Sequence, residues 1–557
     1  MLAKPVLRLL PAVLLALLFA PAAQAQTPVW SRASRLGSFG PDAGDAVAVD
    51  AAGNTYVAGR FGSAGLTVGT TVLNNAANTG TTDVLVAKYS PAGAVLWATR
   101  LGGNGDDAPA ALAVDAAGNA YVAGNFEGTL PVGGNTLASA GTVDMFLVCL
   151  SPAGVPQWGV RAGGTANDVG TAVALDDAGF VWFGGSFQGT ATVSGTANTL
   201  VSAGGFDAAL IKVGAGSGTF VRMGREGGTG GDYLEGLATA GSDVYATGWF
   251  SGATLPVAGG PTFTRRCANR DGFLIKYDRF RTLLWARAEG AAGATRYANY
   301  AVAADPNGTV VTGGEFEGTV VPGGFDTLNN PSATPAPMVV RYDAAGNVTS
   351  GRGGGGLSNG RVTGLARDAA GSTYACGYFR GTTTWGFASA TSAGNNDVFV
   401  VKLPATGSAA WVVRAGGPDN DLAYGLALDA AGLLYLAGAV SGSAPFGTLP
   451  ALVSAGQTDA FVARLGGTIT ATRTARTVQP LAAWPNPVAA DRALHLALPA
   501  AAGPATLRLY DVAGRLAHTQ PVPAAAALTL PAALAPGRYL AEVQAAGQTL
   551  RCALRVE

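Results

Sequence analysis

Histidine is nearly absent from this sequence. The 557 residues contain only two, His495 and His518, and both lie after a long repetitive region. That region therefore cannot build a Ser-His-Asp triad, a Cys-His pair or a His-ligated zinc site. Chemistry that uses carboxylates alone stays open.

Charge and cysteine are also scarce. Charged residues make up 13% of the chain, and 35 basic residues balance 35 acidic ones, so the basic footprint of a nucleic-acid-binding protein is missing. Four cysteines are too few for a disulfide framework in so long a chain. Cys149 and Cys376 fall within strand patterns, and we expect buried thiols there.

What the sequence does have is a repeat. The stretch Asp115–Phe126 predicts a strand, a tight turn and a second strand. Its versions begin at Asp50, Asp115, Asp176, Ala240, Asp305, Asp368 and Asp429. An aromatic-basic-glycine marker, clearest at Trp97–Gly103, precedes the turns with spacings of 61–67 residues. A near-constant period of this size indicates a repeat architecture.

Each repeat predicts four antiparallel strands, in the first copy 45–50, 55–61, 83–89 and 95–101. Seven repeats of four strands indicate an all-β, seven-bladed β-propeller over residues 26–466. Small alternating residues place the first strand of each blade innermost. The last repeat lacks a Trp-bearing fourth strand, so we expect the N-terminal strand 29–36 to complete and close that blade. Residues 468–475 are the competing candidate.

The repeats resemble the SBBP-type β-propeller repeat family of bacterial secreted proteins. The Asp-x-x-Gly-x-x-Tyr-x-x-Gly-x-Phe core and strands such as Asp397–Lys402 carry the resemblance over about residues 28–466. The fourth copy is degenerate at its turn, and the fourth and sixth copies lack the marker Trp. The resemblance implies a propeller and no defined activity.

The N-terminus predicts an export signal. Two basic residues precede an apolar run, Leu9–Ala20, which is too short to span a bilayer comfortably. Ala23 and Ala25 form a small-x-small cleavage site, so residues 1–25 are predicted to be a signal peptide and Gln26 the first mature residue. An uncleaved anchor is the alternative. No later segment has the length of a transmembrane helix.

The chain changes character after the repeats. Residues 467–483 indicate a linker, and the alternating strands of 484–557 predict a small C-terminal β-sandwich. This region resembles the type A C-terminal sorting domain of the type IX secretion system of Bacteroidetes. The resemblance is carried by Pro485, Asn486, Pro487, Asp511, Gly514, Arg515, Pro536, Gly537 and Tyr539. It departs from that family in an Ala-rich middle and in its final residues. It implies transport across the outer membrane, often with removal of the domain. A generic immunoglobulin-like module is the alternative.

The Asp-x-x-Gly turns raise the question of calcium. Calcium requires about six to eight converging oxygens, whereas Asp at a turn commonly bonds to its own backbone. We predict no cofactor, with calcium as the alternative. The residues assigned a structural role are Asp50, Gly53, Asp115, Gly118, Asp176, Gly179, Asp305, Gly308, Asp368, Gly371, Asp429 and Gly432.

A second Asp stands eight residues before the turn, at Asp42, Asp107, Asp168, Asp232 and Asp421. We expect a turn cap or a hydrogen bond to backbone. The alternative is a ring of carboxylates around one mouth of the channel, which would bind a cation or a sugar. A Phe recurs at another fixed position and predicts packing between blades. The series is Phe61, Phe126, Phe187, Phe250, Phe316 and Phe379, with Val440 in the last copy.

Two features remain open. Glu315 and Glu317 lie on one side of a predicted strand, without a partner distance that would define a catalytic pair. The connections between the second and third strands exceed ordinary hairpin loops, and Arg265–Arg270 is the most distinctive. They are either ligand-binding loops or extra short hairpins, for example around Leu130–Leu137.

The sequence favours a binding scaffold, secreted or on the outer surface of a Gram-negative bacterium, with a glycan or protein ligand. We expect a monomer that is not an enzyme, with type IX secretion machinery as the partner of the C-terminal region and no nucleic-acid partner. A carboxylate-based polysaccharide hydrolase or lyase is one alternative, and a purely structural surface component is another. Acidic residues clustered asymmetrically at one channel mouth would favour the enzyme.

Overall fold

The computed structural model describes residues 27–77, 80–324, 326–356, 359–466 and 479–557, the last range with gaps at 482, 490–491, 497, 499–504, 512–515, 524–526 and 546–547. The chain divides into two compact units, Met1–Gly467 and Thr468–Glu557. The described residues form strands and turns with one 3-10 segment, η1 (Pro322–Gly324), and none of their helical segments could cross a membrane. The predicted cleavage residues Ala23, Ala25 and Gln26 lie outside the described residues.

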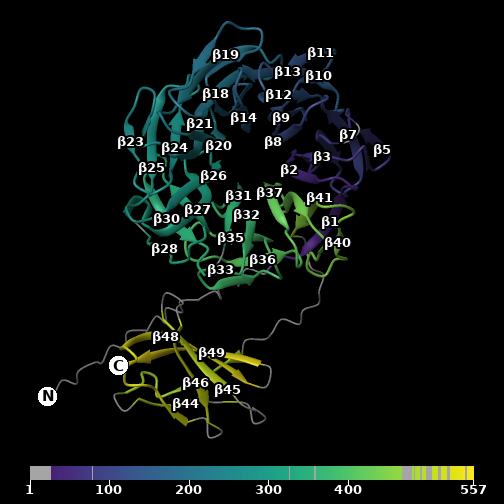
Figure 1. Cartoon of the computed structure of the whole chain (residues 1–557). Coiled ribbons are helices and arrows are strands. Elements are labelled where there is room, and N and C mark those ends of the chain that lie inside the picture. Colours follow the sequence, from purple (N-terminus) through teal and green to yellow (C-terminus); the bar gives the residue numbers. More distant parts are fainter. Residues whose placement is uncertain are drawn as a thin grey trace, which may run out of the picture. The chain divides into compact units, whose positions relative to one another are not determined.

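Seven four-strand antiparallel meanders follow one another within the described residues 30–465 (Figure 1). The first strands are β2 (Asp42–Val49), β8 (Asp107–Val114), β14 (Asp168–Leu175), β20 (Asp232–Ala240), β26 (Arg296–Ala304), β31 (Asn359–Arg367) and β37 (Leu422–Leu428). The second strands are β3 (Thr55–Phe61), β9 (Ala120–Phe126), β15 (Phe180–Phe187), β21 (Asp243–Phe250), β27 (Val310–Val320), β32 (Thr373–Arg380) and β38 (Leu434–Val440).

The third strands are β6 (Asp83–Tyr89), β12 (Asp144–Leu150), β18 (Asp207–Gly214), β24 (Asp271–Tyr277), β29 (Ala336–Tyr342), β35 (Asp397–Leu403) and β41 (Asp459–Leu465). The fourth strands are β7 (Val95–Leu101), β13 (Pro156–Gly163), β19 (Phe220–Glu226), β25 (Leu283–Glu289), β30 (Val348–Gly353), β36 (Trp411–Ala415) and, for the last meander, β1 (Trp30–Leu36).

The first strands surround one axis. Each of them packs against the first strand of the next meander, and β37 packs against β2, so the circle is closed (Figure 1). This agrees with the prediction that the strand rich in small residues is innermost. An all-β chain of small antiparallel sheets around one axis is a β-propeller fold.

The N-terminal strand supplies the missing fourth strand. β1 pairs antiparallel with β41 from Leu36↔Ala460 to Trp30↔Leu465. Trp30 is buried against Phe446, with ring centroids 5.1 Å apart, and its indole N–H donates to the Arg414 carbonyl at 3.2 Å. Sequence segments more than 420 residues apart are thereby joined, as the sequence predicts.

The first strands begin earlier than predicted. β2 begins at Asp42, not at residue 45, because a β-bulge interrupts its pairing with β3 between Gly44 and Ala46. A bulge adds one residue and shifts the inward–outward alternation by one position. A strict period of two therefore recognises only the part of the strand after the bulge.

Short hairpins fill most of the long connections between second and third strands. These are β4 (Gly65–Val68) with β5 (Thr71–Asn74), β10 (Thr129–Val132) with β11 (Asn135–Ala138), β16 (Thr190–Val193) with β17 (Thr199–Val201), β22 (Thr254–Pro256) with β23 (Thr262–Thr264), β33 (Thr382–Trp385) with β34 (Ala388–Thr391), and β39 (Ser443–Ala444) with β40 (Leu452–Val453). In the fifth meander β28 (Leu328–Asn330) pairs with the end of β27. The hairpin considered around Leu130–Leu137 is confirmed.

The hydrophobic core lies between neighbouring sheets. Phe126, for example, packs in one cluster with Val84 and Val86 of the preceding meander. The six predicted packing phenylalanines and Val440 are all at most 1% exposed, which confirms their assignment to the core. Burial of one such side chain contributes roughly 1.5–3 kcal/mol to stability.

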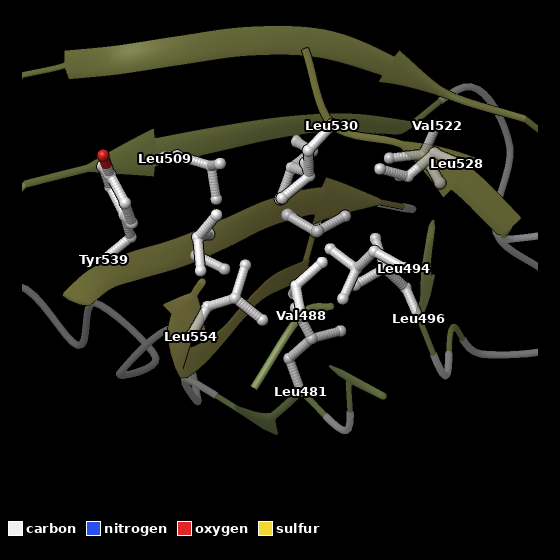
Figure 2. Packing of buried hydrophobic residues seen from close by; sticks show 14 of the residues in the cluster. Leu481, Val488, Leu494, Leu496, Leu509, Val522, Leu528, Leu530, Tyr539 and Leu554 are labelled. Carbon is white, nitrogen blue, oxygen red and sulfur yellow. The ribbon is translucent and has the colours of Figure 1, made fainter. Parts of the chain in front are cut away.

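The second unit holds two small sheets. One contains β42 (Gln479–Pro480), β49 (Gln548–Val556), β48 (Gly537–Ala545), β45 (Ala505–Tyr510) and β46 (Leu516–Val522), and the other contains β43 (Ala483–Trp484), β44 (Ala493–Leu496) and β47 (Ala527–Thr529). Their buried side chains form one core, which includes Val488, Leu494, Leu509 and Leu554 (Figure 2).

Candidate functional site

Most carboxylates of the repeated Asp turns accept hydrogen bonds within their own turns, and Asp305 instead pairs with Arg367 at 2.7 Å. Asp50 Oδ1 accepts hydrogen bonds from the backbone N–H groups of Ala52 (3.0 Å) and Asn54 (2.9 Å), and its Oδ2 lies 3.4 Å from Lys88 Nζ. The turn glycines have φ values of +78° to +86°, a range that favours glycine. They are Gly53, Gly118, Gly179, Gly308, Gly371 and Gly432. In the part of the chain that the structure describes, no three His, Cys, Asp or Glu side chains gather as cation ligands.

The second Asp series caps backbone instead of lining a channel mouth. Asp168 is fully buried and accepts hydrogen bonds from the N–H groups of Gly164 (2.7 Å) and Gln188 (3.2 Å). Burial raises the pKa of Asp168 to about 6 and that of Asp107 to about 8. The alternative of a carboxylate ring is wrong for these residues because their carboxylates are enclosed.

A third buried Asp opens most of the third strands and pairs with the marker arginine of the neighbouring fourth strand. Asp144 Oδ2 lies 2.7 Å from Arg161 Nη1 and accepts the Ala140 N–H at 2.8 Å. The corresponding pairs are Asp83–Arg100, Asp207–Arg225, Asp397–Arg414 and Asp459–Arg35. These ion pairs explain the basic residue of the repeat marker.

The β-bulge is the feature that creates a site. All seven first strands carry it at the same position, and a bulge re-aims the extra residue. The backbone is thus repeated, whereas the residue type at the bulge varies among the copies. The bulge residues are Asp45, Ala110, Thr171, Glu235, Tyr300, Thr363 and Tyr424.

Polar and aromatic side chains gather on one side of the axis, where the first strands begin. We call the axial cluster the residues Glu235, Trp249, Arg270, Arg296, Tyr300, Glu315 and Arg361. They come from the fourth, fifth and sixth meanders. The bulge residues of the second and third meanders, Ala110 and Thr171, are small, so the cluster is asymmetric.

Glu315 is the centre of the axial cluster. Its carboxylate is 1% exposed, and three guanidinium groups surround it. Glu315 Oε1 lies 2.8 Å from Arg270 Nη2 and 3.6 Å from Arg296 Nη1, and Oε2 lies 3.3 Å from Arg361 Nε. The Tyr300 hydroxyl donates to Oε1 at 3.2 Å. One buried carboxylate therefore holds three arginines in place.

Glu235 lies beside an aromatic platform. The Trp249 indole N–H donates to Glu235 Oε1 at 2.8 Å. Tyr233 stacks on Trp249 with ring centroids 4.0 Å apart, and the Arg270 guanidinium lies 4.7 Å from the Trp249 ring centre. Tyr233, Glu235, Trp249 and Arg270 all remain partly exposed.

Arg361 joins the cluster to a second aromatic group. Its guanidinium lies 4.4 Å from the Tyr300 ring centre and 5.6 Å from that of Tyr378. Tyr424 of the next meander is close enough to feel the charges of Asp45, Arg60 and Arg361. Arg60 and Asp45 form their own pair at 3.3 Å. Side chains of the first meander thus reach the same end of the axis.

Glu235 and Glu315 lie in different electrostatic surroundings. Burial raises the pKa of Glu235 to about 7, the Glu315 charge adds to that rise, and the Trp249 hydrogen bond and the Arg361 and Arg270 charges oppose it. Burial and the Glu315 charge raise the pKa of Tyr300, so its hydroxyl stays protonated at neutral pH. The cluster offers many fixed donors, a titrating carboxyl and exposed ring faces.

The sequence patterns single out some residues of the axial cluster. Glu315 belongs to it, and Glu317, singled out with it, forms an ion pair with Arg296 at 3.0 Å. In the loop Arg265–Arg270, the N–H groups of Arg266 and Cys267 cap Asp271, and Arg270 reaches the cluster. The repeat pattern does not identify the bulge residues. The signal that could identify them is a position whose residue type varies within an otherwise repeated strand.

A separate surface cavity of about 600 Å³ lies between the fifth and sixth meanders. Its lining includes Asp326, Arg352 and Thr384. The two ionisable groups pair with one another at 2.7 Å and are well exposed. This cavity lies apart from the axial cluster and offers little chemistry.

The C-terminal motif residues are placed as follows. Asn486 donates from Nδ2 to the Ala553 carbonyl (2.8 Å) and accepts the Arg555 N–H (2.9 Å), so the Pro485–Pro487 motif is bonded to β49. The Tyr539 hydroxyl donates to the Ala535 carbonyl at 2.7 Å, beside Pro536 and Gly537. Asp511 follows β45. Gly514 and Arg515 lie outside the described residues.

Fold and repeat together define the chain as a β-propeller protein. Residues 96–125 match the family model of SBBP, a β-propeller repeat. A curated relative, the regulatory protein FlaEY of Caulobacter vibrioides, is 32% identical over 146 residues, or 26% of this chain. The chain spans only 15% of the length of that relative.

Several solved structures are similar in fold. They include an ulvan lyase of polysaccharide lyase family PL25 (11% identity, 76% of this chain and 97% of that chain, TM-score 0.39) and a europium-containing methanol dehydrogenase (10%, 78% and 93%, 0.38). A protein of unknown function from Dyadobacter fermentans is another (11%, 80% and 100%, 0.36). These likenesses carry no argument about activity.

Proposed function

We propose that this protein is a secreted or cell-surface binding scaffold and that the axial cluster receives its ligand. A glycan is the ligand that the site suits best. The single observation that carries the proposal is the bulge, at which the seven repeated strands present five different residue types. Variable side chains on a rigid, repeated backbone are where recognition is expected.

Binding fits the cluster better than catalysis. Hydrolysis of a glycosidic bond by carboxylates commonly uses two carboxyl groups that flank the bond, one as the acid and the other as the base or the nucleophile. Glu315 is held by three arginines and Glu317 by Arg296, so Glu235 has no free carboxylate partner within the axial cluster. Burial raises the pKa of Tyr300, so it stays protonated and is not available as a base at neutral pH. The alternative of a hydrolase or lyase rests on the raised pKa of Glu235 alone.

A polysaccharide array tests the proposal. The chain from Gln26 to Glu557 is applied with and without calcium, and bound polysaccharides are then incubated with the protein to detect shortened chains. Saturable binding without shortening supports the scaffold. Shortening of a bound polysaccharide would favour the enzyme. Absence of any glycan binding would favour a protein as the ligand of the site. Binding that depends on calcium would support the Asp turns as calcium ligands.

The full architecture and export route are part of the same proposal. The seven meanders are the blades of a seven-bladed propeller, closed by β1, and residues 484–557 are a sorting β-sandwich after the linker 467–483. Support comes from the resemblance of the C-terminal motifs to type IX sorting domains and from the signal-like N-terminus. A reporter placed between residues 1–25 and residues 467–557 should reach the outer surface of a bacterium with that secretion system and should not reach it in a strain that lacks the system.

A further inference from the structure

We propose that the ligand of the axial cluster is an acidic saccharide, a glycan that carries carboxylate or sulfate groups. This inference rests on the proposed function and specifies its ligand class. The argument has three steps, which concern hydrogen-bond supply, ring faces and rigidity.

The cluster has more hydrogen-bond donors than acceptors. Each guanidinium has about five N–H donors, so Arg270, Arg296 and Arg361 bring about fifteen, to which Trp249 and Tyr300 add one each, whereas Glu235, Glu315 and Glu317 together accept about twelve bonds. The Tyr300 hydroxyl competes for Glu315 Oε1 as a further donor. A ligand that matches such a site is rich in acceptors. Planar guanidinium groups recognise carboxylate and sulfate-like oxygens through paired hydrogen bonds.

The rings next to these donors point to a sugar rather than a small anion. Tyr233, Trp249, Tyr300, Tyr378 and Tyr424 are all partly exposed around the same end of the axis. Aromatic side chains with a polar tip offer an apolar face together with a hydrogen-bonding edge. A pyranose ring presents the matching combination of C–H faces and hydroxyl groups, and an acidic one adds the acceptors.

The donors are already in position. Glu315 is buried and bonded on both oxygens, and Arg361 is further fixed between Tyr300 and Tyr378. Arg270 is fixed over Trp249. Side chains that are ordered before binding lose little entropy when the ligand arrives. Arg361, about one-third exposed, is the guanidinium best placed to meet a ligand.

The test compares three polysaccharides by affinity electrophoresis with the chain from Gln26 to Glu557. Polygalacturonate carries carboxylates, dextran sulfate carries sulfates, and dextran is neutral. We expect one or both charged polymers, but not dextran, to retard the protein. Comparison of polygalacturonate with dextran sulfate shows whether carboxylate or sulfate groups are recognised. Monomeric galacturonate should compete with polygalacturonate better than galactose does.

The site is tested with Arg361→Lys, which keeps the charge and loses the paired donors. We expect the Kd for the retained polymer to rise at least tenfold. The matched control is Arg352→Lys, an arginine of similar exposure that pairs with Asp326 away from the axis, and it should bind like the unchanged protein. Unchanged melting temperatures show that both variants are folded.

The outcomes separate this inference from the proposed function. Binding of dextran alone would overturn the acidic ligand and leave the glycan scaffold standing. Binding of both polyanions that is equal in the Arg361→Lys variant would overturn the site, since it would reflect overall charge. Binding of no polysaccharide would overturn the glycan function as well and favour a protein ligand.

Discussion

At the scale of the residue, the backbone cap and the variable side chain stand at different positions of the same first strand. The first residue of β14, Asp168, is enclosed and bonds to backbone, while the bulge residue Thr171 three positions later faces a neighbouring first strand and donates to the Leu234 carbonyl at 2.6 Å. The position equivalent to Thr171 holds Glu235 in β20 and Tyr300 in β26. A substitution at the bulge therefore changes the site without changing the cap.

Glu235 should make ligand binding depend on pH. Its pKa of about 7 means that it is neutral below that pH and negative above it. The charges that face it are those of Arg361, Arg270 and Glu315, and Asp45 at the same end of the axis also has a pKa that burial raises to about 7. An acidic polymer should therefore bind more weakly as the pH rises from 6 to 8. The measurement is Kd by affinity electrophoresis across this range.

Glu235→Gln is the matched variant for this pH dependence. It keeps an acceptor for the Trp249 indole and removes the titration of this side chain, so its Kd should change less between pH 6 and 8 than the Kd of the unchanged protein. A variant that shows the same pH dependence as the unchanged protein would assign the effect to another group.

Asp168 should stabilise the fold through its two backbone hydrogen bonds. Asp168→Ala leaves the N–H groups of Gly164 and Gln188 without their acceptor, which costs roughly 1–3 kcal/mol for the buried Gly164 group and less for Gln188, which is exposed. Asp168→Asn keeps one acceptor and should cost less. Urea denaturation followed by tryptophan fluorescence measures both, and equal midpoints for the two variants would contradict the capping role.

The same carboxyl predicts a pH trend in stability. Burial raises the pKa of Asp168 in the folded state to about 6, from an ordinary value near 4. Its contribution is thus complete below about pH 4 and declines as the pH rises through 6. The Asp168→Asn variant should lose this part of the decline, so its stability relative to that of the unchanged protein should increase over that range. Urea midpoints of both proteins, measured from pH 4 to pH 7, make the comparison.

At the scale of the element, β1 is the strand on which closure depends. It covers the edge of β41 and pairs Arg35 with the buried Asp459 at 2.5 Å. An uncovered strand edge is open to pairing with another chain. Removal of residues 26–36 should therefore lower the melting temperature and produce oligomers in size-exclusion chromatography.

Trp30→Ala tests the same element without removing the strand. Trp30 is 5% exposed, so truncation should cost about 3–5 kcal/mol. Leu96→Ala, at a side chain that is 53% exposed, is the control and should change stability little. If both substitutions shift the urea midpoint equally, β1 does not carry the closure.

At the scale of the whole molecule, the parts that repeat could be predicted and the parts that differ could not. The Asp-x-x-Gly turns, the buried Phe series and the place of β1 follow from periodicity, because packing imposes the same residue types on every copy. The bulge is hidden from such reasoning, since it breaks the period of two at Asp45 and Glu235. The partners of Glu315 come from three meanders, and no spacing along the chain brings Arg270, Arg296 and Arg361 together.

The division into two units leads to a last prediction. All seven residues of the axial cluster lie between Glu235 and Arg361, within the unit Met1–Gly467. A chain that ends at Gly466 should therefore bind the retained polysaccharide with the same Kd as the chain that ends at Glu557. Titration of both forms in affinity electrophoresis makes the comparison, and the Arg361→Lys substitution should weaken binding equally in each. A large loss of affinity on truncation would mean that the C-terminal unit contributes to recognition and that the site extends beyond the axial cluster.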